Sequence, residues 1–150
     1  MFSSGVDLHR HDLYTSGSII LQDKASCLPA FFLAPPPHAK VLDACSAPGN
    51  KTTHLSALMN NTGTVYAFEL NPSRFKILGS TVKRAGASNV VTHQGDFLKV
   101  KPKDYSMVTH MLLDPSCSCS GMVDRMDEFL DAGSCFAPDH HYSAKVTIRI

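Results

Sequence analysis

The fold is decided by the stretch Leu42-Asp43-Ala44-Cys45-Ser46-Ala47-Pro48-Gly49-Asn50-Lys51-Thr52. An apolar strand leads into it, Pro48-Gly49 signals a tight turn, and a helix is expected from near Thr53, capped by Asn50 or Thr52. Such a turn leaves backbone N–H groups at a helix N-terminus, where a carboxylate or phosphate group binds favourably. The stretch therefore predicts a cofactor-binding loop, with an ordinary strand-to-helix connection as the alternative.

The sequence of this stretch differs from two common nucleotide-binding motifs. A P-loop has a glycine directly before its Lys-Ser/Thr pair and another glycine five places earlier. Here Asn50 and Cys45 stand at those positions. The dinucleotide fingerprint needs three glycines, and Gly49 is the one glycine in the stretch. The loop is therefore expected to bind a cofactor of another kind.

A second strand supports the cofactor interpretation. The segment Thr64-Val65-Tyr66-Ala67-Phe68-Glu69 is apolar and ends in an acid, 20 positions after Gly49. Nucleotide-binding α/β folds place the carboxylate that binds the ribose hydroxyls at about this interval. Glu69 is therefore a candidate ribose ligand.

Strands and helices alternate along most of the chain. This order predicts an α/β fold with a Rossmann-like, doubly wound, mostly parallel sheet, whose ligands bind at the carboxyl ends of the strands. The expected helices cover residues 25–33, 53–60 and 72–85, and the further strands cover 89–93 and 107–113. In the first helix the apolar face is expected to hold Leu28, Phe31 and Phe32. Four candidate site residues fall at the strand ends, namely Cys45, Glu69, Asp96 and Asp114.

Composition limits the class of protein. The 150 residues are 43% hydrophobic, as expected for one domain, and the formal charge of +1 gives no basic footprint of a nucleic-acid binder. The lysines of residues 99–103 are expected to be solvated. Five cysteines, an odd number, indicate a reduced, intracellular protein. We find no secretion signal and expect no membrane span.

The segment after the last apolar strand is rich in reactive groups. Residues 113–121 supply the carboxylate of Asp114, the thiols of Cys117 and Cys119, and several hydroxyls. A Ser/Gly-rich turn is the simpler interpretation. Zinc binding by the two thiols lacks a second Cys or His pair, so no metal is expected. No aromatic residue follows Asp114-Pro115, which argues against a methylase of base amino groups.

Several of these motifs, in order, resemble the NOL/NOP/Sun family of S-adenosylmethionine-dependent RNA cytosine-5 methyltransferases, particularly its ribosomal-RNA-modifying fifth member. The resemblance spans about residues 5–122, and its segments are 7–14, 20–30, 42–52, 68–74, 95–97 and 113–118. It divides the chain into an N-terminal lead-in with its helix (1–39), an S-adenosylmethionine-binding core (40–122) and a divergent tail (123–150).

The resemblance also implies roles for individual residues. The methionine part of the cofactor would be surrounded by the loop residues Cys45, Ser46, Ala47, Pro48, Gly49, Asn50 and Lys51. Glu69 would bind the ribose, Arg74 would brace that carboxylate, and Asp96 would lie beside the adenine. Asp114 would face both the cofactor and a flipped cytosine, and Cys117 would assist release of the product.

The chemistry of the family needs one more thiol. Carbon 5 of cytosine is a poor nucleophile, so a thiolate must first add at carbon 6 of a base that has left its stack. The family's nucleophile lies in a later Thr-Cys motif, where this chain has Lys145 after Ala144. Cys135 lacks the motif, and Cys119 replaces an expected small residue. The chain therefore resembles a truncated core that lacks this nucleophile.

Three functions remain open from the sequence. The first is an RNA cytosine-5 methyltransferase with impaired catalysis, acting on ribosomal RNA in the nucleus or nucleolus. The second is a non-catalytic module that binds the cofactor or RNA, and the third is a methyltransferase for another substrate. Val146, Ile148 and Ile150 alternate and can add a short strand. Without the remaining family strands, we expect the fourth strand to expose an edge and the chain to aggregate or fold marginally.

Overall fold

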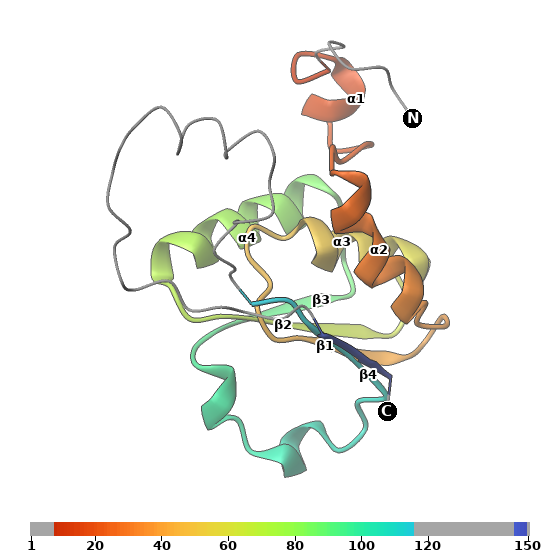
Figure 1. The fold of residues 1–150 in the computed structure, drawn as a ribbon. Helices are drawn as coiled ribbons and strands as arrows, with labels where there is room; N and C mark the ends of the chain where they lie inside the picture. The colour runs from red at the N-terminus through yellow and green to blue at the C-terminus, as the bar shows by residue number, and fades with distance from the viewer. Residues whose placement is uncertain (1–7, 116–145, 150) are drawn as a thin grey trace, which may run out of the picture.

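The computed structural model describes residues 8–115 and 146–149. Within this part of the chain five strands form one sheet in the order β3-β2-β1-β4-β5 (Figure 1). The strands are β1 (Lys40–Asp43), β2 (Thr64–Glu69), β3 (Val90–Gln94), β4 (His110–Leu113) and β5 (Val146–Arg149). The first four are parallel, and β5 runs antiparallel to β4. The predicted Rossmann-like α/β fold is confirmed.

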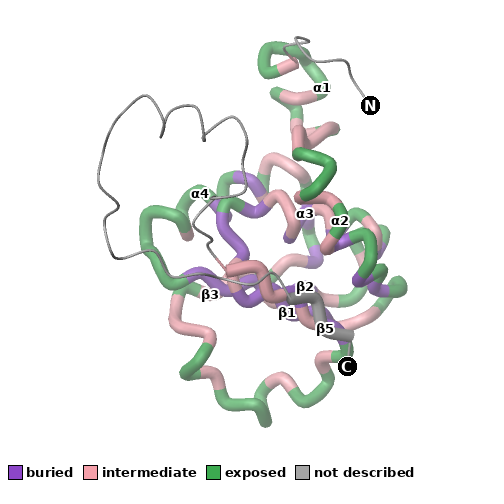
Figure 2. The backbone as a smooth tube through the Cα atoms, viewed as in Figure 1, coloured by how far each residue is buried: buried purple, intermediate pink, exposed green. Residues whose placement is uncertain are grey.

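The central strand β1 is buried because both of its edges and both of its faces are covered. Val41 pairs with Val65 on one side and His110 on the other, and it is fully buried. Near-continuous apolar residues are typical of such a parallel strand. Figure 2 shows buried residues along the strands and in parts of the helices.

The helices α2 (Lys24–Leu33), α3 (Asn50–Leu58) and α4 (Pro72–Arg84) cover one face of the sheet. The crossover from β3 to β4 passes over the other face as two short 3-10 turns, η1 (Phe97–Lys99) and η2 (Pro102–Tyr105). Both faces are thus covered, as a doubly wound sheet requires. The lysines of this crossover are exposed, as expected.

Helix α3 begins three residues earlier than expected. Its N-cap is Gly49, which adopts a φ of 108°, so neither Asn50 nor Thr52 caps it. The hydroxyl of Thr52 instead donates to Asp43 at 2.7 Å. Glycine tolerates this backbone conformation without steric cost, and the helix can therefore start directly at the end of the turn.

Helix α4 confirms its predicted start. The side chain of Asn71 accepts hydrogen bonds from the N–H groups of Ser73 and Arg74 at 2.9 and 3.1 Å, and Pro72 occupies the first helical position. Both features are favoured at a helix N-terminus. Leu78 is fully buried and packs with Ala47 and Ala67 beneath the helix.

The apolar face expected for α2 is wrong. Ala30 and Leu33 are buried at 0% and 1% exposure, whereas Phe31 and Phe32 are 61% and 72% exposed. Leu28 is also exposed. Ala30 lets the helix approach the sheet closely, and Leu33, one turn on, joins the same core cluster. The prediction was wrong because it assigned the largest apolar side chains of the helix to the buried face.

A short N-terminal helix, α1 (Asp12–Thr15), precedes α2. The guanidinium of Arg84 lies 4.8 Å from the ring centroid of Tyr14, a cation–π contact. Gly17 has a φ of 81°, and a Cβ at this position would lie 1.8 Å from the carbonyl oxygen of Arg84. The lead-in thus contacts the end of α4 at these two points, while most of its remaining side chains are exposed, as expected for a segment that packs in part.

Two further boundaries and one edge differ from expectation. Strand β3 lies one residue later than predicted, and β4 starts at His110 instead of at Met107. The expected short strand near Val146 is present as β5, and it pairs with β4. The prediction of an exposed β4 edge is therefore wrong, while the tendency to aggregate or fold marginally stays a prediction. Cys117, Cys119, Cys135 and residues 123–145 lie outside the described residues.

Candidate active site

The four parallel strands end at one edge of the sheet, and four carboxylates meet there. Asp43 and Glu69 are the last residues of β1 and β2. Asp96 follows β3 and caps η1 by accepting a hydrogen bond from Leu98 N at 3.0 Å. Asp114 comes directly after β4. The topology therefore places the predicted residues Glu69, Asp96 and Asp114 at this edge together with Asp43, as expected for a parallel α/β sheet.

The loop between β1 and α3 is held in place by its neighbours. The N–H of Ala44 donates to Leu112 O at 3.0 Å, and the N–H of Ser46 donates to Phe68 O at 2.9 Å. These bonds tie the loop to the ends of β4 and β2. A Cβ added at Gly49 would lie 3.1–3.2 Å from side-chain atoms of α4. The loop is a preformed structure with little room for larger residues.

Glu69 is oriented by two groups from the start of α4. The N–H of Asn71 donates to Glu69 Oε1 at 2.8 Å, and Arg74 Nη1 lies 3.7 Å from Glu69 Oε2. Arg74 Nη2 also donates to Ala47 O at 2.6 Å. Arg74 therefore bridges the glutamate and the loop, and the expected contact between Arg74 and Glu69 is present.

Lys51 and Asp114 form an ion pair with an N–O distance of 2.6 Å. Their side chains are 18% and 11% exposed, so solvent screens the pair only in part. The pair joins the first turn of α3 to the loop after β4, and sequence motifs alone did not suggest it. Thus the loop and Asp114, predicted to face the same cofactor, are in direct contact.

Asp43 is a site residue that the motif analysis missed. Its pKa is raised to about 6, with burial as the largest cause and the charge of Asp114 as a smaller one. Hydrogen bonds from the Thr52 hydroxyl and the Cys45 backbone and the charge of Lys51 act in the opposite direction. Its signal in the sequence was an acid at the end of a buried strand. It holds Thr52 at the base of the loop.

Cys45 is unsuited to act as a thiolate. It is half-buried, and burial raises the pKa of its thiol, with further increases from the carboxylates of Asp43, Glu69 and Asp114. A raised pKa keeps a thiol protonated and weakly nucleophilic at neutral pH. Cys45 therefore fits a structural place in the loop and not the role of a nucleophile.

Metal and membrane features are absent from the part of the chain that the structure describes. In residues 8–115 and 146–149 no three His, Cys, Asp or Glu side chains come together in a way that could hold a metal ion. None of the helices described there has the length and apolar character needed to cross a membrane.

Comparisons with known proteins agree with this geometry. Residues 30–130 match the family described as 16S rRNA methyltransferase RsmB/F. The chain is 51% identical over 130 residues to the 28S rRNA (cytosine-C(5))-methyltransferase of Mus musculus, covering 85% of this chain and 28% of the relative. It is also 51% identical over 133 residues to the 25S rRNA (cytosine-C(5))-methyltransferase NSUN5 of Arabidopsis thaliana, covering 87% and 24%.

A solved structure supports the fold. The methyltransferase homolog protein from Pyrococcus horikoshii superimposes with a TM-score of 0.68 at 30% identity, covering 85% of this chain and 42% of that chain. The present chain spans only 28% and 24% of the length of the two curated relatives.

Proposed function

This chain belongs to the 16S rRNA methyltransferase RsmB/F family, and on that basis we propose that it is an S-adenosylmethionine-dependent methyltransferase core. Its proposed target is carbon 5 of a cytosine in RNA, and ribosomal RNA in particular. The nucleus or nucleolus is the corresponding place of action. The observation that carries the proposal is the oriented Glu69 beside a preformed loop at the strand ends.

The residues at the strand ends fit the proposed cofactor. The Glu69 carboxylate would accept hydrogen bonds from the two ribose hydroxyls, and Arg74 would keep it in position. The loop from Cys45 to Lys51 would surround the methionine part, and Asp96 would lie beside the adenine. When bound, S-adenosylmethionine supplies an electrophilic methyl group.

Asp114 is the proposed contact to the target base. Its carboxyl group would hydrogen-bond the N3 and amino edge of a flipped cytosine, which stabilises charge that develops on the ring. Lys51 holds Asp114 through their ion pair. Cys117 would assist release of the product, and it lies outside the described residues.

The environment of the two described thiols favours a second, non-catalytic function. Cys27 lies in α2, and the raised pKa of Cys45 keeps that thiol protonated. Among the residues that the structure describes, no activated thiol therefore stands at the strand ends. A module that binds the cofactor or RNA without turnover is the alternative that follows. A methyltransferase for another substrate would place its product on protein or on a ring nitrogen.

We also propose that the chain divides into three parts. Residues 40–122 would form the cofactor-binding core, residues 1–39 the lead-in, and residues 123–150 a divergent tail. Ala30 and Leu33 of α2 pack in the same cluster as Val41 and Leu55. This packing supports a lead-in helix that is built onto the core.

A calorimetric titration with S-adenosylmethionine tests the cofactor site. Glu69→Ala is expected to weaken binding at least about 100-fold, because it removes two hydrogen bonds to a charged group that contribute about 1.5–3 kcal/mol each. Asp104→Ala, which removes an exposed acid from η2, is the matched control and should bind as the wild type does. A folded wild-type chain that does not bind the cofactor would contradict the proposal.

Methyl transfer separates the two functions. Incubation with ribosomal RNA and labelled cofactor, followed by nucleoside analysis, should yield 5-methylcytidine if the chain turns over. Cofactor binding without product would instead support the non-catalytic module. Robust methylation that is abolished by Cys135→Ala or Cys119→Ala would show that the chain carries its own nucleophile.

A further inference from the structure

The carboxylates of the described chain gather at the strand ends, which leaves the rest of its surface basic. Residues 8–115 hold eleven Lys and Arg residues and seven Asp and Glu residues. Four of these acids, Asp43, Glu69, Asp96 and Asp114, lie at the strand-end edge. Residues 8–115 therefore carry a formal charge of +4, and the fold separates their strand-end acids from most of their basic residues.

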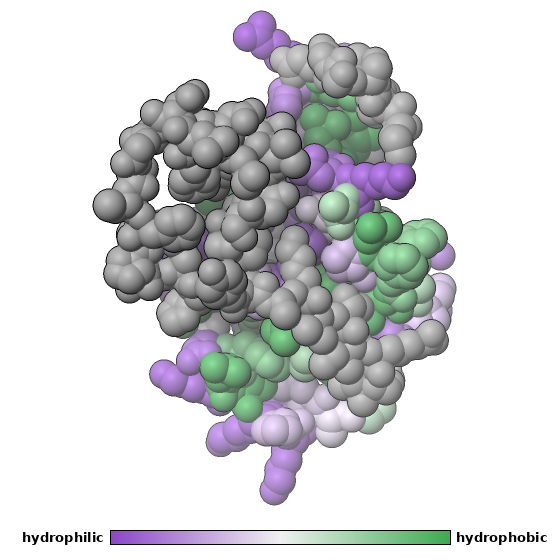
Figure 3. All heavy atoms as spheres, viewed as in Figure 1, coloured by the Kyte–Doolittle hydropathy of each residue, from purple (hydrophilic) through white to green (hydrophobic). Residues whose placement is uncertain are grey.

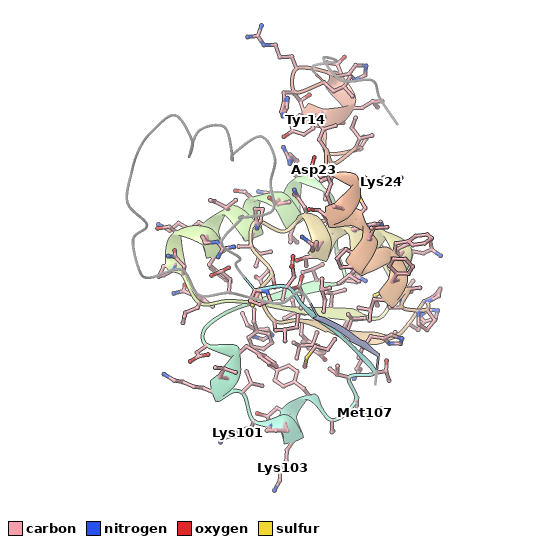
Figure 4. The ribbon with its side chains drawn as sticks, viewed as in Figure 1. Tyr14, Asp23, Lys24, Lys101, Lys103 and Met107 are labelled. Atoms are coloured by element: carbon pink, nitrogen blue, oxygen red, sulfur yellow. The ribbon has the colours of Figure 1, made fainter. Side chains whose placement is uncertain are left out.

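The crossover from β3 to β4 carries three of the basic residues at alternate positions, Lys99, Lys101 and Lys103. All three are exposed. Within residues 8–115 and 146–149, none of them forms an ion pair. Figure 4 shows Lys101 and Lys103 pointing away from the sheet. We call residues 97–105 with these lysines the lysine platform.

Aromatic contacts to β2 and backbone hydrogen bonds hold the lysine platform in place. Phe97 and Tyr105 pack edge-to-face on Phe68, with ring centroids 5.8 and 5.6 Å apart. Tyr105 also contacts Tyr66 at 5.0 Å. Backbone hydrogen bonds from Lys99 N to Asp96 O and from Asp104 N to Lys101 O close the two turns. An anchored surface loses less conformational entropy when it binds a partner.

The platform starts at the candidate site and carries apolar surface as well as charge. Asp96 accepts the hydrogen bond from Leu98 N that begins η1. Leu98 is 88% exposed and Met107, just beyond η2, is 67% exposed. In Figure 3 hydrophobic and hydrophilic side chains lie side by side at the lower end of the molecule, where η1 and η2 lie in Figure 1. Apolar side chains can contact the sugar and base faces of a nucleic acid.

We propose that the lysine platform binds the phosphate backbone of the RNA strand on which the site acts. The identity of the partner rests on the proposed function. Three exposed lysines that form no ion pair with another described residue complement a polyanion, and phosphate contacts position a nucleic acid without reading its sequence. An acidic protein segment would meet the same charges, and it is the alternative that the test must separate.

The test compares binding of a fluorescein-labelled, single-stranded 20-nucleotide RNA by fluorescence anisotropy at several salt concentrations. The platform variant is Lys99→Gln/Lys101→Gln/Lys103→Gln. The matched control is Lys24→Gln/Lys76→Gln/Lys83→Gln, which removes the same charge from exposed positions of α2 and α4. We expect the platform variant to bind about 10-fold more weakly and its salt slope to fall by about 2, since each single-strand phosphate contact contributes about 0.7.

Three outcomes would overturn the proposal. They are an equal loss in the two variants, no loss in the platform variant, and a wild-type chain that binds poly-glutamate but not RNA. Urea unfolding of each variant verifies that the fold is intact. A parallel titration with S-adenosylmethionine should give the wild-type affinity in the platform variant. Failure of the wild type in that titration would count against the proposed function, while the RNA comparison would still decide the role of the platform.

Discussion

The ammonium nitrogen of Lys51 lies 2.6 Å from Oδ2 of Asp114. This contact connects the two segments that were predicted to face the same ligand, the loop before α3 and the turn after β4. Both side chains are largely buried, at 18% and 11% exposure. The geometry of the site therefore depends on a pair of opposite charges that must be kept together.

Removing one member of this pair should destabilise the fold. We expect Lys51→Met to lower the free energy of unfolding by about 1–3 kcal/mol, because it removes the cation that lies against the largely buried carboxylate of Asp114. The double variant Lys51→Met/Asp114→Asn should recover part of that loss. Urea unfolding measures both values. Equal stability of the wild type and the single variant would show that solvent already screens the pair.

Asp43 should make stability depend on pH. Its pKa is about 6 in the folded chain and about 3.9 when unfolded. Between these values the unfolded chain releases the proton first, so stability should fall as pH rises from about 4 to about 6. The loss from this group is about 2–3 kcal/mol, at about 1.4 kcal/mol for each pKa unit.

Asp43→Asn isolates this effect, since asparagine keeps an acceptor for the Thr52 hydroxyl and does not ionise. The difference in unfolding free energy between the variant and the wild type should shift in favour of the variant by about 2–3 kcal/mol across the same pH window. Urea unfolding at pH 4, 5, 6 and 7 provides the measurement. A difference that is constant with pH would contradict the raised pKa of Asp43.

Two glycines should respond oppositely to alanine. Gly49→Ala places a Cβ 3.1–3.2 Å from Thr81 and Leu78 at a residue with a φ of 108°, and we expect a loss of about 1–3 kcal/mol. In the described part of the chain, a Cβ added at Gly79, inside α4, has no atom within 4 Å apart from its own helix backbone and chain neighbours. Gly79→Ala should therefore stabilise the chain by about 0.5–1 kcal/mol.

Thermal melts and cofactor titrations distinguish these variants. Gly49→Ala should weaken S-adenosylmethionine binding as well as stability, because it displaces the loop from α4. Gly79→Ala should leave binding unchanged. Normal affinity and stability in Gly49→Ala would mean that the loop adapts to an added methyl group.

Adjacent residues of α2 test which face of the helix is buried. Leu33→Ala should cost about 2–5 kcal/mol because it opens a cavity in the core. Phe32→Ala removes a larger side chain that is 72% exposed and should change stability by less than about 0.5 kcal/mol. Denaturant midpoints of the two variants give the comparison. A larger loss of stability in Phe32→Ala than in Leu33→Ala would indicate that the face predicted from the sequence is the buried one.

Local patterns in the sequence were sufficient for the order of elements and for the edge at which the site lies. Asn71-Pro72 marks the start of α4, and the apolar run before Glu69 marks β2, because capping and strand formation depend on neighbouring residues. Parallel strands place their carboxyl ends together, so the alternating order already predicted that Glu69, Asp96 and Asp114 would meet.

Only the tertiary structure decided which side chains face one another. Ala30 is buried and Phe32 is exposed because close packing on β4 and α3 selects shape as well as hydrophobicity. The contact between Lys51 and Asp114 and the burial of Asp43 depend on residues brought together by the sheet. Such contacts have no local signature, because the free energy of a long-range pair is set by the folded surroundings and not by its neighbours in the chain.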